Sequence, residues 1–281
     1  MDVLETIEQM RFACQAAKQR GKRLGFVPTM GALHEGHLSL VRAAKARCDV
    51  VAASIFVNPT QFGPTEDFSK YPRSFERDRE LLEKEGVKLL FAPSVEEMYP
   101  RDAVTFVTVE GLSERLCGKS RPGHFRGVTT VVAKLFHITQ PDLAFFGQKD
   151  AAQVAIIRRM VRDLNLGVEI VVCPIVREAD GLAMSSRNAY LSPAQRRSAL
   201  VLSRSLAQVK KLFEQGERST AKLGAAGRQG FAGEPSVRLD YLEVVDPNTL
   251  EPVEHLNRPA LVAVAAFVGG TRLIDNIVLT P

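Results

Sequence analysis

The sequence predicts an α/β protein: a domain built on a parallel sheet, followed by a smaller α+β domain. Strand-like apolar runs alternate with amphipathic, helix-like stretches as far as about residue 175, which is the pattern of a parallel sheet covered on both faces. The length of 281 residues, 45% of them apolar and 25% charged, fits one or two ordinary globular domains. We therefore expect one domain over residues 1–175 and a smaller C-terminal domain over residues 176–281.

A strand–helix–strand unit opens the first domain. The apolar run at 24–29 is interpreted as the first strand, helical spacing follows at 38–46, and the β-branched run at 49–57 suits a buried strand. The same alternation predicts helices at 75–85, from about 127 and at 151–164, and strands at 87–91, 142–146 and 168–173. Ligands of such sheets bind at the carboxyl ends of the strands.

The second domain has a different pattern. A helical stretch at 193–215 precedes a Gly-rich and Ala-rich connection around 224–233, and strands are expected at 237–245 and 261–268. The polar segment 174–192 joins this part to the first domain. These features predict a small α+β unit.

Charge alone does not identify a partner. The 37 basic and 32 acidic residues give a net charge of +5, which could serve nucleic acid, an anionic surface or a phosphate-bearing small molecule. The densest basic pairs are Arg158-Arg159, Arg196-Arg197 and Lys210-Lys211, and they fall in helical patterns where a solvated face is the simpler interpretation. We therefore expect no nucleic-acid partner.

Cysteine spacing and hydropathy favour a cytoplasmic protein. The four cysteines are far apart, without the close pairs of a zinc site, and no secretory leader suggests an oxidising compartment. The longest apolar run, 260–268, is less than half of the roughly 20 residues that a membrane-spanning helix needs. We expect free thiols and no membrane association.

The first cluster of chemically useful residues lies at 28–37, where the first strand turns into a helix. His34 and His37 are three residues apart and would share one face of the helix start. Glycines let the backbone approach a ligand, and free N–H groups at the positive helix end attract phosphate. The site suits a nucleotide polyphosphate, with the histidines donating to oxygens that gain charge as diphosphate leaves. A zinc site and a pair of structural histidines remain alternatives, although a zincin needs one more residue between its histidines.

Two later polar clusters could meet the same ligand. Lys149, in the segment 145–150 at another strand end, can reach phosphate oxygens, and Asp150 can accept from ribose hydroxyls or cap the next helix. The segment 180–188, between the two domains, offers two hydroxyls and a guanidinium to phosphate and could close over a nucleotide. Taken alone, this segment would be an ordinary polar loop.

Three familiar motifs are missing. Gly118-Lys119-Ser120 resembles the end of a P-loop, but position 113 is serine where that motif requires glycine. No Gly-x-Gly-x-x-Gly fingerprint and no Gly-x-Ser-x-Gly elbow is present. Their absence argues against P-loop NTPases, dehydrogenases and α/β-hydrolases.

A family resemblance joins these clusters. The His-x-Gly-His turn and the later Met-Ser-Ser-Arg loop resemble the paired signatures of the nucleotidyltransferase superfamily, which includes class I aminoacyl-tRNA synthetases. Longer matches resemble the pantothenate synthetase, or pantoate beta-alanine ligase, family over essentially the whole chain. They lie at 28–40, 56–62, 66–67, 71–73, 121–128, 146–150, 180–188 and 272–276.

The resemblance implies a Rossmann-like ATP- and pantoate-binding domain with a C-terminal lid domain. The implied reaction is the ATP-dependent condensation of (R)-pantoate with beta-alanine, giving pantothenate, AMP and diphosphate through a pantoyl adenylate. Transfer of adenylate to a carboxylate creates the leaving group that amine attack needs. The implied catalytic residues are His37, the family's proposed proton donor, with His34, Lys149, Ser185 and Arg187.

The same resemblance implies the binding residues. Gln61 and Gln153 correspond to the pantoate contacts, where an amide can donate to a carboxylate and accept from a hydroxyl. The implied ATP-binding residues are Met30, Gly31, Ala32, Leu33, His34, Glu35, Gly36, His37, Gly147, Gln148, Lys149, Asp150, Val176, Met184, Ser185, Ser186 and Arg187.

Mg²⁺ is expected mainly on the ATP phosphates, because this cation keeps its waters and seldom needs an all-protein cage; no residue is predicted as a metal ligand. The resemblance also implies a homodimer. Two rival hypotheses remain: a different nucleotidyltransferase of the superfamily, in which Gln61 and Gln153 would not matter, and a basic RNA-binding module suggested by the pI of about 9.1.

Overall fold

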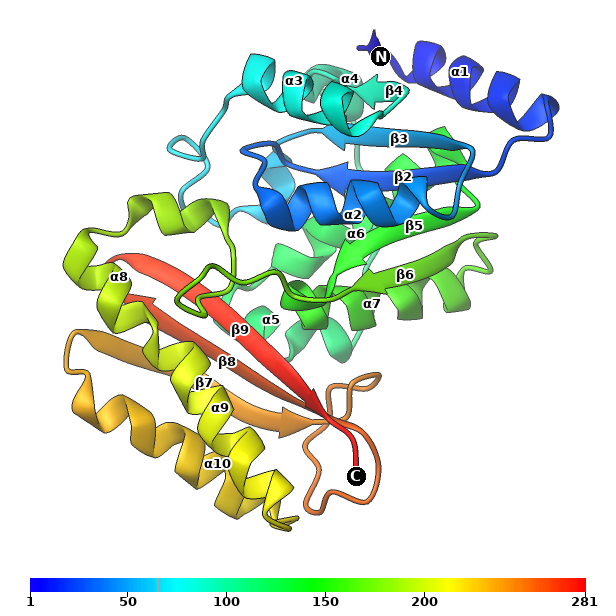
Figure 1. Cartoon of the computed structure of the whole chain (residues 1–281). Coiled ribbons are helices and arrows are strands. Elements are labelled where there is room, and N and C mark those ends of the chain that lie inside the picture. The colour runs from blue at the N-terminus through cyan, green and yellow to red at the C-terminus, as the bar shows by residue number, and fades with distance from the viewer. Residues whose placement is uncertain (65) are drawn as a thin grey trace.

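The computed structural model describes residues 1–64 and 66–281, which form two sheets flanked by helices (Figure 1). The large sheet is parallel, in the order β1 (Asp2–Leu4), β4 (Leu89–Phe91), β3 (Val50–Ile55), β2 (Leu24–Thr29), β5 (Leu143–Gly147) and β6 (Glu169–Cys173). The small sheet is antiparallel, in the order β7 (Val237–Val245), β8 (Ala260–Val268) and β9 (Thr271–Leu279). The predicted α/β class with a separate smaller sheet is confirmed.

Helices cover both faces of the large sheet. Buried residues of α1 (Ile7–Gln19), α6 (His124–Thr139) and α7 (Ala151–Asp163) pack against one face. Those of α2 (Glu35–Lys45) and α3 (Phe75–Glu85) pack against the other. The remaining helices are α4 (Val95–Met98), α5 (Cys117–Ser120), α8 (Pro193–Ala199), α9 (Val201–Glu214) and α10 (Thr220–Gln229). Because all strands run in one direction, their carboxyl ends share one edge, which faces the small sheet.

The small sheet also has two covered faces. In β8, Val262 and Val264 belong to the core formed with α9 and α10. Leu261 and Ala263 belong instead to the core of the large sheet. Alternate side chains of a strand point to opposite faces. One face of the small sheet therefore packs against α9 and α10, and the other packs against the large-sheet core. Such double burial explains why β8 is apolar throughout.

Several predicted boundaries are wrong. The strand at 24–29 is the second, because β1 precedes it at the sheet edge, and β9 was not predicted. The predicted helix at 193–215 is two helices separated at Leu200, and α6 begins at His124 rather than near 127. The expected Gly-rich connection at 224–233 is mostly the helix α10. A two-domain division at residue 175 remains a prediction.

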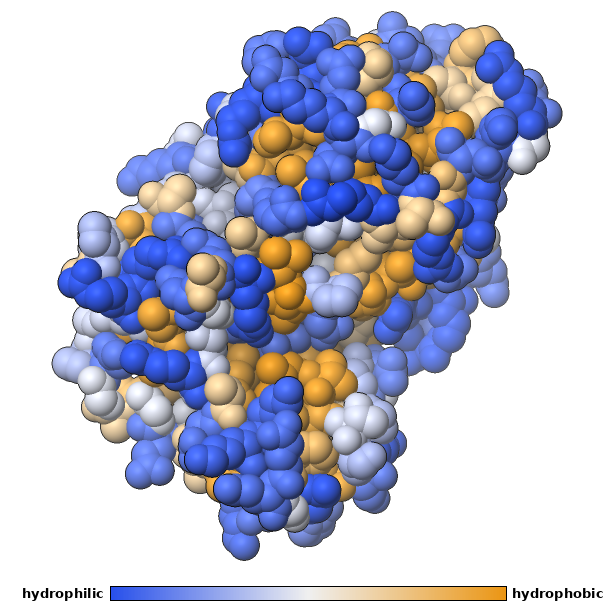
Figure 2. Space-filling view, in the orientation of Figure 1, coloured by the Kyte–Doolittle hydropathy of each residue, from blue (hydrophilic) through white to orange (hydrophobic). Residues whose placement is uncertain are grey.

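The visible surface is largely hydrophilic. Figure 2 shows hydrophilic residues over most of the helices that face the viewer, with apolar residues in the hollows between them. Among the residues that the structure describes, no helix is both long and apolar enough to span a membrane. In the same residues all four cysteines are unpaired, and Cys48 alone is only partly buried.

Candidate active site

A carboxylate from α3 holds the turn between β2 and α2. Asp78 is fully buried and accepts hydrogen bonds from the N–H groups of Ala32 at 2.7 Å and Leu33 at 2.9 Å. Gly31 has a φ of 80°, which favours glycine, and an added Cβ would lie 3.1 Å from Asp78 Oδ2. The sequence predicted free N–H groups here, but these two are already bound.

The two histidines cap α2. The Nδ1 atom of His37 accepts from the N–H of His34 at 3.3 Å, and the Nδ1 atom of His34 accepts from the N–H of Gly36 at 3.1 Å. Because a backbone N–H can only donate, each neutral ring carries its proton on Nε2. The rings lie side by side, with centroids 4.1 Å apart. Helix capping therefore leaves both Nε2–H groups available for a ligand.

Burial keeps both imidazoles uncharged at neutral pH. It lowers the pKa of His37 to about 3, and repulsion from Lys149 and from His34, when that ring is protonated, adds to the effect. It lowers the pKa of His34 to about 4, again with help from Lys149. In the described part of the chain, no group of three His, Cys, Asp or Glu residues is arranged to hold a metal ion. The rings are thus hydrogen-bond donors rather than proton donors in the free protein.

Strand β9 holds the second cluster in place. Asn276 Nδ2 donates to the carbonyl oxygens of Gln148 at 3.0 Å and Lys149 at 2.9 Å, and Gln148 Nε2 donates to Asn276 Oδ1 at 3.0 Å. Lys149 Nζ lies 3.8 Å from a carboxylate oxygen of Asp150. Asp150 precedes α7 but its side chain makes no capping hydrogen bond. The carboxylate is therefore not used as a helix cap.

The segment between the two sheets crosses to the β2–α2 turn. Ser186 Oγ donates to the carbonyl oxygen of Ala32 at 3.0 Å. Arg187 makes a bidentate ion pair with Asp67, at 3.0 and 2.9 Å. Burial alone would raise the pKa of Asp67, but the hydrogen bonds from Arg187 outweigh it and hold this pKa below its usual value. Arg187 is thus ordered before any ligand binds.

One cavity brings the three clusters together. It is lined by Met30, His34, Gly36, His37, Leu40, Tyr71, Gly147, Lys149, Asp150, Pro174, Ile175, Val176, Met184, Ser185, Ser186 and Arg187. Of the predicted ATP residues, Gly31, Ala32, Leu33, Glu35 and Gln148 do not line it. Leu33 is in the core, and Glu35 pairs with Arg42 on the surface.

A second cavity adjoins the first and contains both predicted glutamines. Gln61 follows β3, Gln153 lies on α7, and both line this space together with His37 and Asp150. Gln61 is held by Asn58, whose Nδ2 donates to Gln61 Oε1 at 3.1 Å. Val128, Val131, Val132 and Leu135 of α6 form an apolar part of the cavity wall. The cavity can therefore hold a small acid with a branched hydrocarbon centre.

The sequence predicted no role for a half-buried polar network beside Gln61. Arg121 makes a bidentate ion pair with Glu66 and donates to His124 Nε2 at 3.0 Å. His124 Nδ1 then donates to the carbonyl oxygen of Gln61 at 2.8 Å, since a carbonyl can only accept. Burial and the Arg121 charge lower the pKa of His124 to about 4. The Arg-Pro-Gly-His match at 121–124 was the available signal.

Main-chain turns at the ends of parallel strands bring two capping imidazoles and a lysine to one cavity, an arrangement that suits a phosphate-bearing ligand of an α/β enzyme. The sequence model described as Pantoate-beta-alanine ligase matches residues 2–278. The chain belongs to this family.

Relatives that carry the name pantothenate synthetase match this chain over nearly its full length. The chain is 60% identical to "Pantothenate synthetase" of Koribacter versatilis (strain Ellin345), covering 99% of this chain and 96% of the relative. It is 64% identical to the protein of that name from Acidobacterium capsulatum, covering 98% and 96%.

Solved structures agree as well. The crystal structure of pantothenate synthetase from Thermus thermophilus is 48% identical, covers all of both chains and has a TM-score of 0.95. Pantoate-beta-alanine ligase from Francisella tularensis, "Complexed with Beta-gamma ATP and Beta-alanine", is 34% identical, with a TM-score of 0.78 and coverage of 99% and 97%.

Proposed function

We propose that this chain condenses (R)-pantoate with beta-alanine at the expense of ATP, forming pantothenate, AMP and diphosphate through a pantoyl adenylate. The observation that carries the proposal is the meeting of three distant polar clusters around one cavity, beside a second cavity with two amide side chains. Family membership supports the same reaction.

ATP would occupy the cavity lined by His34, His37, Lys149 and the 184–187 segment. Nε2–H groups of the two imidazoles and the Lys149 ammonium would donate to phosphate oxygens. A bound triphosphate would also offer Arg187 a new anionic partner in place of Asp67. Mg²⁺ would be carried mainly by the phosphates and waters, and Asp150 is a carboxylate that lines the same cavity.

Pantoate would occupy the second cavity, between Gln61 and Gln153. Its two methyl groups would contact the valines of α6, while the amides bind its hydroxyl and carboxylate groups. One carboxylate oxygen would attack the α-phosphorus, and the bond from that phosphorus to the diphosphate oxygen would break. Donors fixed in advance, such as His37 Nε2–H, stabilise the negative charge on the leaving diphosphate. The amine of beta-alanine would then attack the acyl carbon and release AMP.

Product analysis tests the reaction. Purified protein given ATP, Mg²⁺, pantoate and beta-alanine should release AMP and diphosphate in equal amounts, and release of ADP and phosphate would contradict adenylation. Without beta-alanine, pantoate alone should support exchange of labelled diphosphate into ATP. Gln61→Ala should reduce pantoate-dependent exchange and leave ATP binding intact, whereas an enzyme for another acid would be indifferent to this change.

We also propose a homodimer. Residues 104–106 make no backbone hydrogen bond within the described part of the chain, and Val104 and Phe106 are 83% and 44% exposed. The flanking Val107 is fixed to α6 through Thr129 and Thr130. An exposed segment whose backbone groups have no partner in the described part of its own chain can pair with a second copy. Val104→Asp should shift the sedimentation of the protein toward the monomer, and unchanged sedimentation would exclude this surface.

We also propose that the protein is cytoplasmic and that it binds neither nucleic acid nor a membrane. One member of each basic pair that could have served nucleic acid has an acidic partner: Arg159 pairs with Asp163, Arg196 with Glu178, and Lys210 with Glu214. The smaller part, 176–281, would act as a lid over the nucleotide, since its Ser186 and Asn276 already contact the edge of the large sheet.

A further inference from the structure

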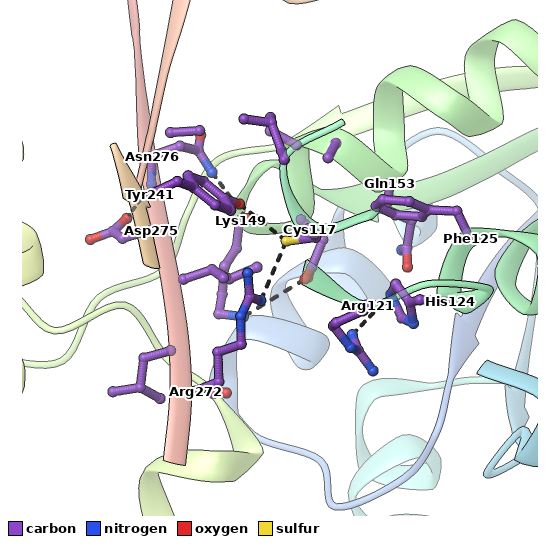
Figure 3. A pocket seen from close by; sticks show the side chains of 18 of the residues that line it. Cys117, Arg121, His124, Phe125, Lys149, Gln153, Tyr241, Arg272, Asp275 and Asn276 are labelled. Carbon is purple, nitrogen blue, oxygen red and sulfur yellow. Dashed lines mark hydrogen bonds and ion pairs between the residues drawn. The ribbon is translucent and has the colours of Figure 1, made fainter. Parts of the chain in front are cut away.

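A third cavity lies between the large sheet and the inner face of the small sheet (Figure 3). It shares Arg121, His124, Asp150, Gln153 and Arg187 with the proposed pantoate cavity, so the two spaces adjoin. A ligand here could therefore reach a pantoyl group bound beside Gln153.

The far end of this cavity holds a fixed guanidinium. Arg272 of β9 donates through Nε at 3.0 Å and Nη2 at 2.7 Å to the same oxygen of Asp240. Ser120 Oγ also donates to that oxygen, at 2.8 Å. Two bonds to one carboxylate leave the guanidinium little freedom to rotate, so Nη1 keeps a constant position in the cavity wall.

The donors at this end have a poor acceptor. Arg272 Nη1 lies 3.5 Å from Cys117 Sγ, and the Tyr241 hydroxyl lies 3.1 Å from the same sulfur (Figure 3). A thiol sulfur accepts hydrogen bonds only weakly. Within the described residues, no carboxylate or carbonyl oxygen accepts a hydrogen bond from Nη1. Burial raises the pKa of Tyr241, so its hydroxyl stays protonated. An anionic oxygen would satisfy both groups.

The other cations of the same cavity already have partners. Lys149 Nζ lies 3.8 Å from a carboxylate oxygen of Asp150 and, in the proposed function, turns to phosphate. The Arg121 guanidinium bonds to Glu66, His124 and the Gln61 carbonyl oxygen. Arg187 is paired with Asp67 and, in the proposed function, turns to phosphate. The Arg272 end is thus the part of the cavity that can take a new carboxylate without breaking an existing ion pair.

We propose that Arg272 Nη1 and the Tyr241 hydroxyl bind the carboxylate of beta-alanine and direct its amine toward the pantoyl carbonyl. The inference rests on the proposed function, which requires an ω-amino acid as nucleophile but assigns it no site. Asp150, on the stretch that the cavities share, can accept a hydrogen bond from the arriving amine. The carboxylate of the pantothenate product would occupy the same position.

The test compares beta-alanine with propylamine, which has the same amine on a similar chain but no carboxylate. In Arg272→Gln the KM for beta-alanine should rise about 10-fold to 100-fold, the range of a charge-assisted hydrogen bond. The preference for beta-alanine over propylamine should shrink by the same factor. Pantoate-dependent diphosphate exchange, measured without an amine, should fall much less than the coupled reaction.

Two further variants complete the experiment. Tyr241→Phe keeps the ring and should raise the KM for beta-alanine about 3-fold to 10-fold, so it decides the question even if Arg272→Gln does not fold. Arg238→Gln removes an exposed guanidinium that stacks on Phe267, outside the cavity, and should change none of these values.

Three results would overturn the proposal. One is an unchanged preference for beta-alanine over propylamine in Arg272→Gln. Another is a loss of exchange equal to the loss of beta-alanine turnover, which would mean that Arg272 supports the fold. The third is an unchanged KM in Tyr241→Phe. Absence of pantoate-dependent exchange in the wild type would instead contradict the proposed function, and the assignment of beta-alanine with it.

Discussion

The two sheets contribute to the site in different ways. The parallel sheet supplies residues from the turns that follow its strands, such as His37 after β2 and Lys149 after β5. The antiparallel sheet supplies residues from within a strand, with Arg272 and Asn276 on the same face of β9. Turns can bring backbone and side chains to a ligand, whereas a strand holds its side chains in a fixed row.

This difference suggests a division of labour. Residues on the turns would act on the phosphates, and residues on β9 would hold the turns and the second substrate. Asn276 is buried and bonds to the main chain of the Lys149 turn, which is a positioning role. The comparison predicts that changes in the turns reduce chemistry most, and that changes in β9 act through binding.

The largest effect is expected at His37, which follows β2. His37→Ala should reduce adenylate formation about 10²-fold to 10³-fold, because it removes a fixed donor directed at developing charge. Pantoate-dependent diphosphate exchange measures this step. His137→Ala, on the exposed end of α6, is the matched control. An unchanged exchange rate in His37→Ala would remove the histidine from the mechanism.

The next largest effect is expected at Lys149, in the turn that follows β5. Lys149→Ala should reduce exchange about 10-fold to 100-fold and weaken ATP binding, since one charge-assisted contact to phosphate is lost. Attack of beta-alanine on supplied pantoyl adenylate should be affected much less, which stopped-flow or quench measurements can establish. Lys210→Ala, on exposed α9, should behave as wild type. Equal losses in both steps would show that the lysine is structural.

A smaller effect is expected from the β9 residue that holds this turn. Asn276→Ala leaves the carbonyl oxygens of Gln148 and Lys149 without their donor. The KM for ATP should rise about 3-fold to 10-fold with little change in the KM for beta-alanine. Asn248→Ala removes an exposed amide on the small part as a control. An Asn276 variant with normal ATP kinetics would contradict the positioning role.

The smallest expected effect is on the free energy of unfolding at acidic pH. It arises from His34 and His37, which lie beside the parallel sheet. His34 and His37 have pKa values of about 4 and 3 in the folded chain, below the ordinary value near 6.5. Below pH 6.5 the unfolded chain therefore binds more protons, and the free energy of unfolding falls by up to about 1.4 kcal/mol per pH unit for each histidine.

Urea unfolding at pH 7.5 and 5.5 measures this dependence. His37→Gln should make the loss of stability on acidification smaller, while His255→Gln, at an exposed position, should leave it unchanged. A His37 variant with the wild-type dependence would mean that the imidazole is already protonated in the folded chain.

The sequence predicted most of the parallel sheet because each of its longer strands is an apolar run between amphipathic helices. It missed β9, whose Arg272, Asp275 and Asn276 interrupt the apolar pattern. Those side chains are buried against polar partners: Asp275 against Arg177, and Asn276 against the Lys149 turn. Polar residues paired across the molecule are indistinguishable from a loop in the sequence.

The glycines of α10 are a second case in which distant contacts decide the local structure. At Gly227 an added Cβ would lie 2.6 Å from Leu242 and 2.9 Å from Val209. The glycine therefore permits close packing of helix on sheet, although in the sequence it indicated a flexible connection. Packing against residues far along the chain overrode the local preference.

Within the site, the groups on the strand-end turns were predicted as candidates, and their partners were not. The two histidines were recognisable because they lie on one turn. Asp78, Asp67 and Asn276, which hold the three clusters, are 45, 120 and 127 residues from the groups they bind. Contacts of that separation are determined by the tertiary fold, and no local pattern encodes them.

The amide of Asn276 donates hydrogen bonds to main-chain carbonyl oxygens and not to the side chain at position 149. Exchanging that side chain therefore should not release the turn from β9. Lysine could be replaced by arginine, methionine or a photocaged analogue with the backbone still anchored. At position 149 the charge offered to the proposed nucleotide should therefore be variable without a change in the backbone around it.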